Sequence, residues 1–178
     1  MAFHHVAVAT RDLEATHRFY TEAMGFELVK VEVAPTPKGG WAKHFFYDTG
    51  GGELMAFWDL HDDTNPDTWS PAISTGLGLP EWVNHLAFAA ADLDDLEARK
   101  QRWLSNGHDV AEIDHRWCAS VYTVDPNGIL VEFCTTTKPF TDDDRRDAAR
   151  LFADPEPPVM PPPEAKFFRA PARTGAST

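Results

Sequence analysis

Two short apolar runs, 80 positions apart, divide most of the chain into similar halves. Residues 3–9 and 83–89 are mostly apolar or β-branched, and an Asp-Leu pair follows each run. The offset is constant: 85 − 5 for His5 and His85 and 92 − 12 for Asp12 and Asp92 both equal 80. A fixed offset between similar segments is typical of an internal duplication. The pattern therefore predicts two copies of one structural unit.

A helical pattern follows the Asp in each copy. Apolar or long side chains recur there every three or four residues, as one face of a helix requires. These positions are Leu13, His17, Tyr20 and Met24 in the first copy and Leu93, Leu96, Lys100 and Leu104 in the second. Gly25 and Gly107 follow, and glycine commonly ends helices. Asp12 and Asp92 can cap the helix starts, because a short carboxylate accepts the first free N–H groups.

Three strand-like runs follow each predicted helix. They cover 26–34, 41–49 and 53–59 in the first copy, and 108–114, 117–124 and 129–135 in the second. The pattern therefore predicts the order β-α-β-β-β for each copy. For the chain it predicts an α+β fold of two such modules. The modules occupy residues 3–59 and 83–135 of a domain that covers 3–135, and residues 60–82 link them.

The composition changes beyond about residue 138. Residues 141–153 predict a short helix that Thr141 caps, with three Asp residues near its positive end. Six prolines between residues 155 and 163 preclude regular structure there. We expect residues 138–178 to form this helix and a Pro-rich tail that is solvated or lies on the surface. Phe167 and Phe168 can anchor the tail to the domain or to a partner subunit.

Charge and composition narrow the classes of partner. The net charge of -12 argues against nucleic acid and against an anionic membrane, because both attract clustered Lys and Arg. No apolar stretch approaches the roughly 20 residues of a membrane span. The N-terminus lacks the pattern of a signal peptide, and two cysteines are too few for a disulfide framework. We therefore expect a cytoplasmic protein.

Alternation along the strands places two histidines at equivalent positions. His5 shares a strand face with Ala7 and Ala9, and His85 shares one with Ala87 and Ala89. A lone His on a strand is more often structural than a ligand. Two at equivalent positions of a repeat would be related by the pseudo-twofold axis between the modules. That symmetry predicts that they meet at the module junction.

The turn before the last strand determines which residue lies opposite Glu132. Residues 126–128, Pro-Asn-Gly, suit a three-residue hairpin loop with Gly128 in the left-handed conformation. Counting back from this loop sets Tyr122 directly opposite Glu132. The same alignment matches Glu132 to Ala56 in the first copy, so the symmetric fourth ligand position is empty.

Two imidazoles and one carboxylate suggest a metal site. His5, His85 and Glu132 form the set that suits Fe(II), which we favour, and also Mn(II); Zn(II) and Ni(II) remain compatible with it. A buried carboxylate on an apolar strand is otherwise costly without a partner. Tyr122 is equally compatible with a catalytic role and with a plain wall position.

Other polar groups have a simpler interpretation. We assign His44, His61 and His115 to the surface or to the surroundings of the ligands, and Cys134 to the buried thiols. Trp58 shares the face of Ala56. An aromatic-lined cavity in an acidic protein suits a flat, largely apolar substrate.

These motifs resemble the vicinal-oxygen-chelate superfamily, over residues 3–135. The resemblance rests on three segments: the strand that carries His5, the similar segment at residues 84–93, and Asp-Pro-Asn-Gly at 125–128 before Glu132. The superfamily includes glyoxalase I, extradiol ring-cleaving dioxygenases, fosfomycin-resistance transferases and metal-free bleomycin-binding proteins. It implies modules whose sheets curl into a mixed sheet around a metal-site cavity. It also implies that the ligands are His5, His85 and Glu132.

The resemblance implies three functions. An Fe(II) dioxygenase acting on a catechol-like or other aromatic vicinal diol is the one we favour, because extradiol dioxygenases use three ligands and place a tyrosine where Tyr122 stands. They also carry a catalytic His before the second metal-binding His, for which His61 is the nearest candidate. Glyoxalase I departs from this sequence at Ala56, where it has a fourth ligand. A metal-dependent lyase, isomerase or epimerase is the alternative, as is a metal-free binding protein. Family members commonly pair, so we expect a homodimer that binds a small aromatic or dioxygen-chelating substrate.

Overall fold

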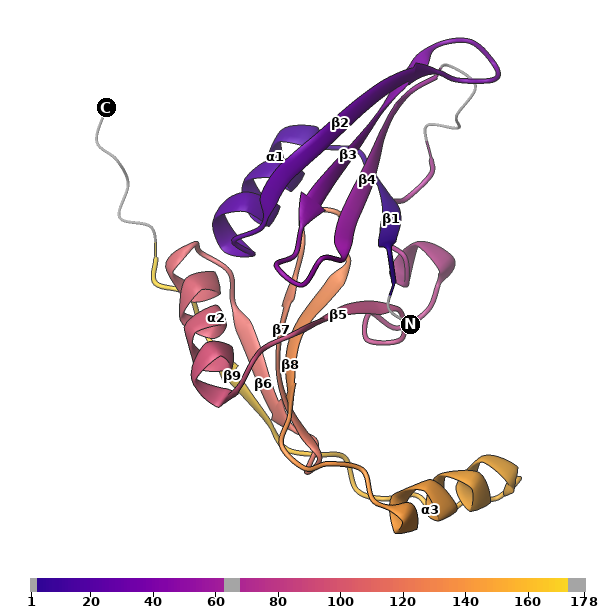
Figure 1. Ribbon diagram of the computed structural model, residues 1–178, viewed down its shortest axis with the longest axis vertical. Coiled ribbons are helices and arrows are strands. Elements are labelled where there is room, and N and C mark those ends of the chain that lie inside the picture. Colours follow the sequence, from indigo (N-terminus) through magenta and orange to yellow (C-terminus); the bar gives the residue numbers. More distant parts are fainter. Residues whose placement is uncertain (1–2, 63–67, 173–178) are drawn as a thin grey trace.

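The computed structural model describes residues 3–62 and 68–172, and two similar modules make up most of it (Figure 1). The first contains β1 (His5–Thr10), α1 (Leu13–Arg18), a π-helical segment (Phe19–Ala23), β2 (Glu27–Pro35), β3 (Trp41–Asp48) and β4 (Leu54–His61). The second contains β5 (His85–Ala89), α2 (Leu93–Ser105), β6 (Val110–Asp114), β7 (Cys118–Val124) and β8 (Leu130–Thr136). A short 3-10 helix (Thr75–Leu77) lies between them, and α3 (Asp142–Ala153) and β9 (Ala165–Phe168) follow.

Each module folds into its own mixed sheet. The first sheet has the order β1-β4-β3-β2, and the second has the order β5-β8-β7-β6-β9. In both sheets the first strand pairs in parallel with the fourth, and the other pairs are antiparallel. The α+β fold of two β-α-β-β-β modules is therefore confirmed. The two sheets remain separate, and β1 and β5 are edge strands.

The helix starts follow the predicted capping. The side chain of Asp12 accepts from the backbone N–H of Ala15, and that of Asp92 accepts from the N–H of Asp95. After the six residues of α1, the hydrogen-bond pattern widens into the π-helical segment, which the apolar spacing did not predict. The chain then leaves the helix at Gly25, whose φ of 77° glycine adopts without strain.

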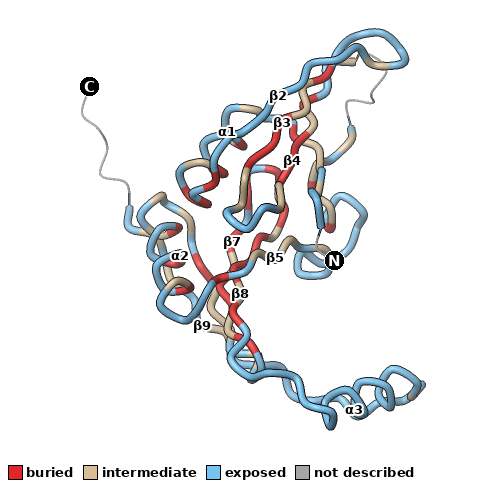
Figure 2. The backbone as a smooth tube through the Cα atoms, in the orientation of Figure 1, coloured by how far each residue is buried: buried red, intermediate tan, exposed pale blue. Residues whose placement is uncertain are grey.

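A common core joins the modules through the sides of the sheets that carry α1 and α2 (Figure 2). It contains the largest buried side chains of both halves: Tyr20, Tyr47, Phe57, Trp103 and Phe133. A polar tether also crosses the junction, because the Tyr20 hydroxyl donates to Asp125 over 3.1 Å. The opposite sheet faces, which carry His5 and His85, are therefore turned away from the core.

Two segments differ from the sequence expectation. β4 ends at His61, so the first residues of the predicted linker belong to a strand. In the tail, β9 pairs antiparallel with β6, just after the last of the clustered prolines. The Pro-rich composition hid this strand, although residues 165–168 contain no proline and two Phe residues. The middle of the linker (63–67) and the end of the tail (173–178) lie outside the described residues.

The C-terminal segment contains the helix α3. Thr141 caps α3, and Asp144 completes the reciprocal hydrogen bond to the backbone of Thr141. No helix in the described part of the chain is long and apolar enough to cross a membrane.

Candidate metal centre

The second sheet brings His85, Glu132 and Tyr122 together. Tyr122 lies directly opposite Glu132 on the β7–β8 pair, as the turn at residues 125–128 predicts. Ala87 lies beside Glu132 on the β5–β8 pair, which sets His85 diagonal to the carboxylate. Nε2 of His85 and Oε2 of Glu132 are 3.1 Å apart, and Glu132 is buried whereas His85 is partly exposed.

The other ring nitrogen of His85 determines what can lie between these two atoms. Nδ1 of His85 is 3.1 Å from the backbone carbonyl oxygen of Trp82. A carbonyl oxygen only accepts, so Nδ1 carries a proton there. In the neutral ring Nε2 then presents a lone pair to the carboxylate. Two acceptors this close require a proton or a cation, and an N–H to carbonyl bond is the usual support of a metal-binding His.

The separation of the two atoms also fits a metal. Ligand atoms about 2.1 Å from an ion lie about 3 Å apart when they occupy neighbouring positions. His85 and Glu132 therefore form a pair of ligand groups with suitable spacing and support.

Tyr122 stands beside this pair. Its hydroxyl is 2.8 Å from Nε2 of His115, which places His115 behind the tyrosine rather than at the metal pair. Burial raises the pKa of Tyr122, and the negative charge of Glu132 adds to this effect. The phenol therefore keeps its proton at neutral pH and can donate a hydrogen bond into the site.

His5 lies on the corresponding face of the first sheet. It faces Leu54 on the β1–β4 pair, and its ring contacts those of Phe46 and His44 at centroid distances of 5.7 and 6.2 Å. Its Nδ1 lies 2.8 Å from Nδ1 of His4. Within residues 3–62 and 68–172, no three His, Cys, Asp or Glu side chains cluster closely enough to hold a metal. One chain therefore brings together two of the predicted ligands and not the third.

His44 is a candidate that sequence reasoning underrated. It pairs with Trp58, which pairs with Ala9, so it shares the face of His5. Its ring stacks on Trp58 at a centroid distance of 3.9 Å, and its Nε2 is buried without a hydrogen-bond partner among the described residues. Burial lowers the pKa of His44, and the charge of His5 lowers it further. Strand alternation would have placed it on this face, given the β3–β4 register.

His61 occupies the other end of the first sheet. It is the last residue of β4, beyond the point where β1 ends beside Asp59. Its Nε2 is 2.9 Å from a carboxylate oxygen of Asp59, and its ring stacks on Trp41 at 3.8 Å. The chain does not bring His61 to Tyr122 or Glu132.

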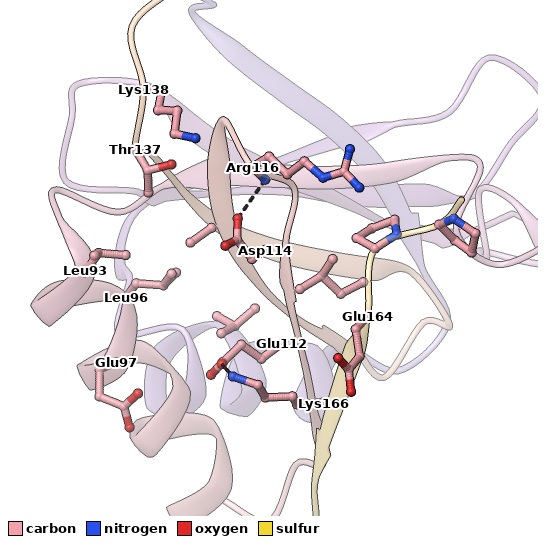
Figure 3. Close-up of a pocket in the computed structure, with 15 residues that line it drawn as sticks. Leu93, Leu96, Glu97, Glu112, Asp114, Arg116, Thr137, Lys138, Glu164 and Lys166 are labelled. Atoms are coloured by element: carbon pink, nitrogen blue, oxygen red, sulfur yellow. Dashed lines mark hydrogen bonds and ion pairs between the residues drawn. The ribbon is translucent and has the colours of Figure 1, made fainter. Parts of the chain in front are cut away.

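A large cavity lies on the other side of the second sheet. It encloses about 850 Å³ between α2, β6, β7 and the segment before β9 (Figure 3). Within its wall, Glu112 pairs with Lys166, and it also pairs with Lys100 of α2. A smaller cleft of about 500 Å³ runs between β5 and the β1–β4 edge, and His85 lines it. The cleft, rather than the larger cavity, adjoins the candidate site.

Aromatic side chains surround both halves of the site. Phe46 lies opposite Ala56 on the face of His5. On the second sheet, the row that contains Glu132 and Tyr122 continues through Ala111 to Phe167 of β9. Phe167 is 78% exposed, so the C-terminal strand adds an uncovered aromatic ring to the face that bears Glu132.

Comparisons with known proteins agree with this architecture. Residues 2–133 match the model of the Glyoxalase/Bleomycin resistance protein/Dioxygenase superfamily. A lactoylglutathione lyase from Agrobacterium tumefaciens is 26% identical, with a TM-score of 0.50 over 75% of this chain and 92% of that one. The fosfomycin resistance protein FosX from Listeria monocytogenes is 16% identical, with a TM-score of 0.53 over 82% and 98% of the two chains.

An antibiotic-binding protein, TnmS3 from Streptomyces sp. CB03234, is 19% identical, with a TM-score of 0.53 over 77% and 97% of the two chains. No curated protein matches the chain in sequence. The similarities below 25% identity bear on the fold alone.

Proposed function

The chain belongs to the Glyoxalase/Bleomycin resistance protein/Dioxygenase superfamily, and on that premise we propose that it is an enzyme whose divalent metal is held by His5, His85 and Glu132. The observation that carries the proposal is the His85–Glu132 pair. Nε2 of His85 and Oε2 of Glu132 are 3.1 Å apart. The Trp82 carbonyl oxygen accepts from Nδ1 of His85, so the ring proton lies on the nitrogen that does not face Glu132. A cation between Nε2 and Oε2 satisfies both.

The third ligand comes from a second copy of the chain in this proposal. His5 and His85 occupy equivalent places on the edge strands β1 and β5, and both site faces point away from the shared core. A second copy can therefore set its His5 face against the His85 face of the first. By twofold symmetry the pair of chains contains two such sites.

The empty fourth position favours Fe(II). Ala56, the counterpart of Glu132, is buried and offers no ligand atom. Three protein ligands leave positions for two adjacent substrate oxygens and for dioxygen, an arrangement that suits Fe(II) most and Mn(II), Zn(II) or Ni(II) less exclusively. The bound ion would supply Lewis-acid activation of the substrate oxygens.

The chain's own residues then bind and orient the substrate. The aromatic rings of Phe46, Trp58 and Phe167 suit a flat, catechol-like substrate. Tyr122 donates a hydrogen bond to oxygen atoms that gain negative charge. His44 accepts a proton at its unpaired Nε2, which a neutral imidazole can do. His61 is the alternative proton carrier, and a second copy would have to bring it to the site.

A lyase is the second candidate, and one observation favours it. The lactoylglutathione lyase from Agrobacterium tumefaciens shares 26% identity over most of both chains. Such an enzyme would use the same ligands with a redox-inert ion and would work without oxygen.

Metal analysis of freshly purified protein tests the metal proposal. We expect about one ion per chain, and a loss of most of it in His85→Ala and Glu132→Ala. His61→Ala is the matched control, and its metal content should equal that of the wild type. A wild-type chain without metal, or a Glu132→Ala chain that retains it, would refute the proposed centre.

Subunit mixing tests the two-copy site. A His5→Ala chain retains His85 and Glu132, and a His85→Ala chain retains His5. After unfolding and refolding together in equal amounts, half of the dimers carry one chain of each kind. Each mixed dimer has one complete site, so about a quarter of the wild-type metal and activity should return. A site built within one chain would regain none.

Oxygen uptake separates the two reactions. Anaerobically iron-loaded protein should consume oxygen with at least one member of a catechol panel. Uptake that disappears in His61→Ala, with the metal content intact, would assign proton transfer to His61 rather than His44. Turnover under nitrogen with Zn(II) or Ni(II), without oxygen uptake, would replace the dioxygenase with the lyase.

A further inference from the structure

The segment between β8 and β9 forms an arm that stands away from the rest of the chain. We use "arm" for residues 138–164, which contain α3 and the Pro-rich return to β9. All residues of α3 are exposed, and Figure 2 shows exposure along nearly the whole arm. The arm lies beyond the residues that match the family model, so the family fold does not account for it.

The arm presents apolar side chains to solvent. Phe152 and Val159 are each 95% exposed, and Phe140 and Met160 are also exposed. Burial of such side chains removes apolar surface from water and is favourable. An isolated helix as short as α3, with 12 residues, is marginal in water. Both observations indicate that the arm packs against a surface that this chain alone does not provide.

The charged side chains of α3 pair with one another along the helix. Three ion pairs with i,i+3 spacing join its acidic and basic side chains: Arg145 with Asp142, Arg146 with Asp143, and Arg150 with Asp147. The helix therefore adds little net charge of its own. In a chain with a net charge of -12, this reduces repulsion when a second acidic copy approaches.

The arm extends toward the side of the second sheet that carries the candidate site. In Figure 1, α3 extends to the side of the second sheet opposite α2. The His85–Glu132 face is also opposite α2, because the shared core occupies the α2 side of that sheet. The start of β1 and the segment before β5 lie on the same side. The residues that precede these strands also expose large apolar side chains, Phe3, Leu77 and Trp82. Resting on the two-copy site proposed above, we infer that the arm packs against a second copy of this chain and holds the two copies together around their shared sites.

Sedimentation of the full-length chain over a range of concentrations tests the arm. The variant Phe152→Ser/Val159→Ser removes two exposed apolar side chains, so the folded monomer should be unaffected. We expect the wild type to form a dimer and this variant to dissociate at concentrations at least tenfold higher. Val33→Ser, which changes an exposed residue of β2 outside the arm, is the control and should dimerise like the wild type.

Hydrogen exchange of α3 provides a second measurement. Its amides should be protected at concentrations where the dimer forms and should exchange freely on dilution. Unprotected α3 amides in a dimer, or an arm variant that dimerises like the wild type, would overturn the inference, as would a wild-type chain that stays monomeric with and without Mn(II).

The two proposals fail in different ways. If mixed His5→Ala and His85→Ala chains regain metal while the arm variant dimerises normally, the shared site stands and the arm inference fails. If the arm variant dissociates but the wild-type dimer binds no metal, the arm inference stands and the metal proposal fails.

Discussion

The two modules share one strand order in their first four strands, and they carry different side chains at equivalent positions of the candidate site. On the site faces, Ala56 of the first module corresponds to Glu132 of the second, and Phe46 corresponds to Tyr122. The first module thus contributes mainly apolar wall, while the second contributes a carboxylate and a phenol. The duplicated fold fixes where these side chains stand, and the residue type at each equivalent position sets which groups each half presents.

The outer edges of the two sheets differ as well. In the second module β9 covers the edge strand β6, whereas in the first module no strand of the described residues pairs with the outer edge of β2. All nine residues of β2 are exposed, including Val31 and Val33. An open, apolar edge strand is a common site of unwanted association, which the second module avoids with its own C-terminal segment. The first module carries charged residues on β2 instead, with Lys30 and Glu32 paired at 3.2 Å.

The turn before the fourth strand should show the largest difference between the modules. Asp125 is buried and accepts hydrogen bonds from Tyr20, Asn127 and the backbone N–H of Ile129. Asp125→Ala leaves these buried donors without an acceptor and should lower the free energy of unfolding by about 3–5 kcal/mol. Its counterpart Thr49 bonds only within its own turn, to the carbonyl of Glu53. Thr49→Ala should therefore cost about 1 kcal/mol or less.

Urea denaturation of both variants measures this difference. Asp125→Asn adds a test of charge, because burial raises the pKa of Asp125. Since the folded pKa lies above the unfolded value of about 3.9, the wild type loses stability as the pH rises from there through the folded pKa. Asp125→Asn should lack this loss. Equal costs for Asp125→Ala and Thr49→Ala would show that the cross-module tether does not stabilise the junction.

Substitutions in β9, the strand that covers β6, should have the second largest effect on the free energy of unfolding. Phe168 of β9 packs against the core, and the ammonium of Lys100 lies 4.5 Å from its ring centre. Phe168→Ala should lower the free energy of unfolding by about 2–3 kcal/mol, less than for a fully buried Phe because the ring is partly exposed. Phe167→Ala should cost less than about 0.5 kcal/mol, since that ring packs on nothing within the chain's core. Calorimetry of the two variants would show whether β9 is a structural part of the second module.

Local patterns predicted most of this fold because they depend on nearby residues. The caps Asp12 and Asp92 and the pairing of Tyr122 with Glu132 follow from turn geometry and strand alternation, which act over a few positions. The constant offset of 80 residues then indicated that the module is duplicated. The sequence could not supply β9, because its pairing with β6 joins distant segments across a Pro-rich stretch whose composition favours irregular structure.

The candidate site was predicted only in part, for a different reason. The sequence placed His5, His85 and Glu132 on faces of one kind. In the structure His85 and Glu132 lie 3.1 Å apart, whereas His5 lies on the first sheet. How the two sheets pack on each other depends on which faces share a core, and strand alternation does not contain that information. His44 was underrated because its face becomes clear only when the β3–β4 register is known.

The ion pairs of Glu112 in the second module should contribute less to the free energy of unfolding. Glu112 on β6 holds the partly buried ammonium of Lys100 at 2.7 Å, where the first module has Val31 and Tyr20. The hydrogen bond from Lys100 lowers the pKa of Glu112. Because the folded pKa lies below the unfolded value of about 4.3, this stabilisation is present at neutral pH and is lost as the pH falls through the folded pKa. Glu112→Gln should therefore cost about 1 kcal/mol at pH 7 and almost nothing near pH 3.

Urea titrations of wild type and Glu112→Gln at both pH values check this dependence. Glu27→Gln, an exposed change on β2, provides the control and should have no effect at either pH. A cost for Glu112→Gln that stays constant with pH would mean that shape rather than charge accounts for the contribution of Glu112.

The open edge of the first module should tolerate substitution best. Val33 on β2 is 64% exposed and has no strand on its outer side, so Val33→Thr keeps a β-branched side chain and removes little packing. The free energy of unfolding should change by less than about 0.5 kcal/mol. Val110→Thr makes the same exchange on β6, where the side chain is 2% exposed, and it should cost several times more, because it buries a hydroxyl beside the β9 cover. Similar costs for the two variants would mean that β2 is also covered in solution, and the contrast between an open and a closed edge would then apply to the isolated chain alone.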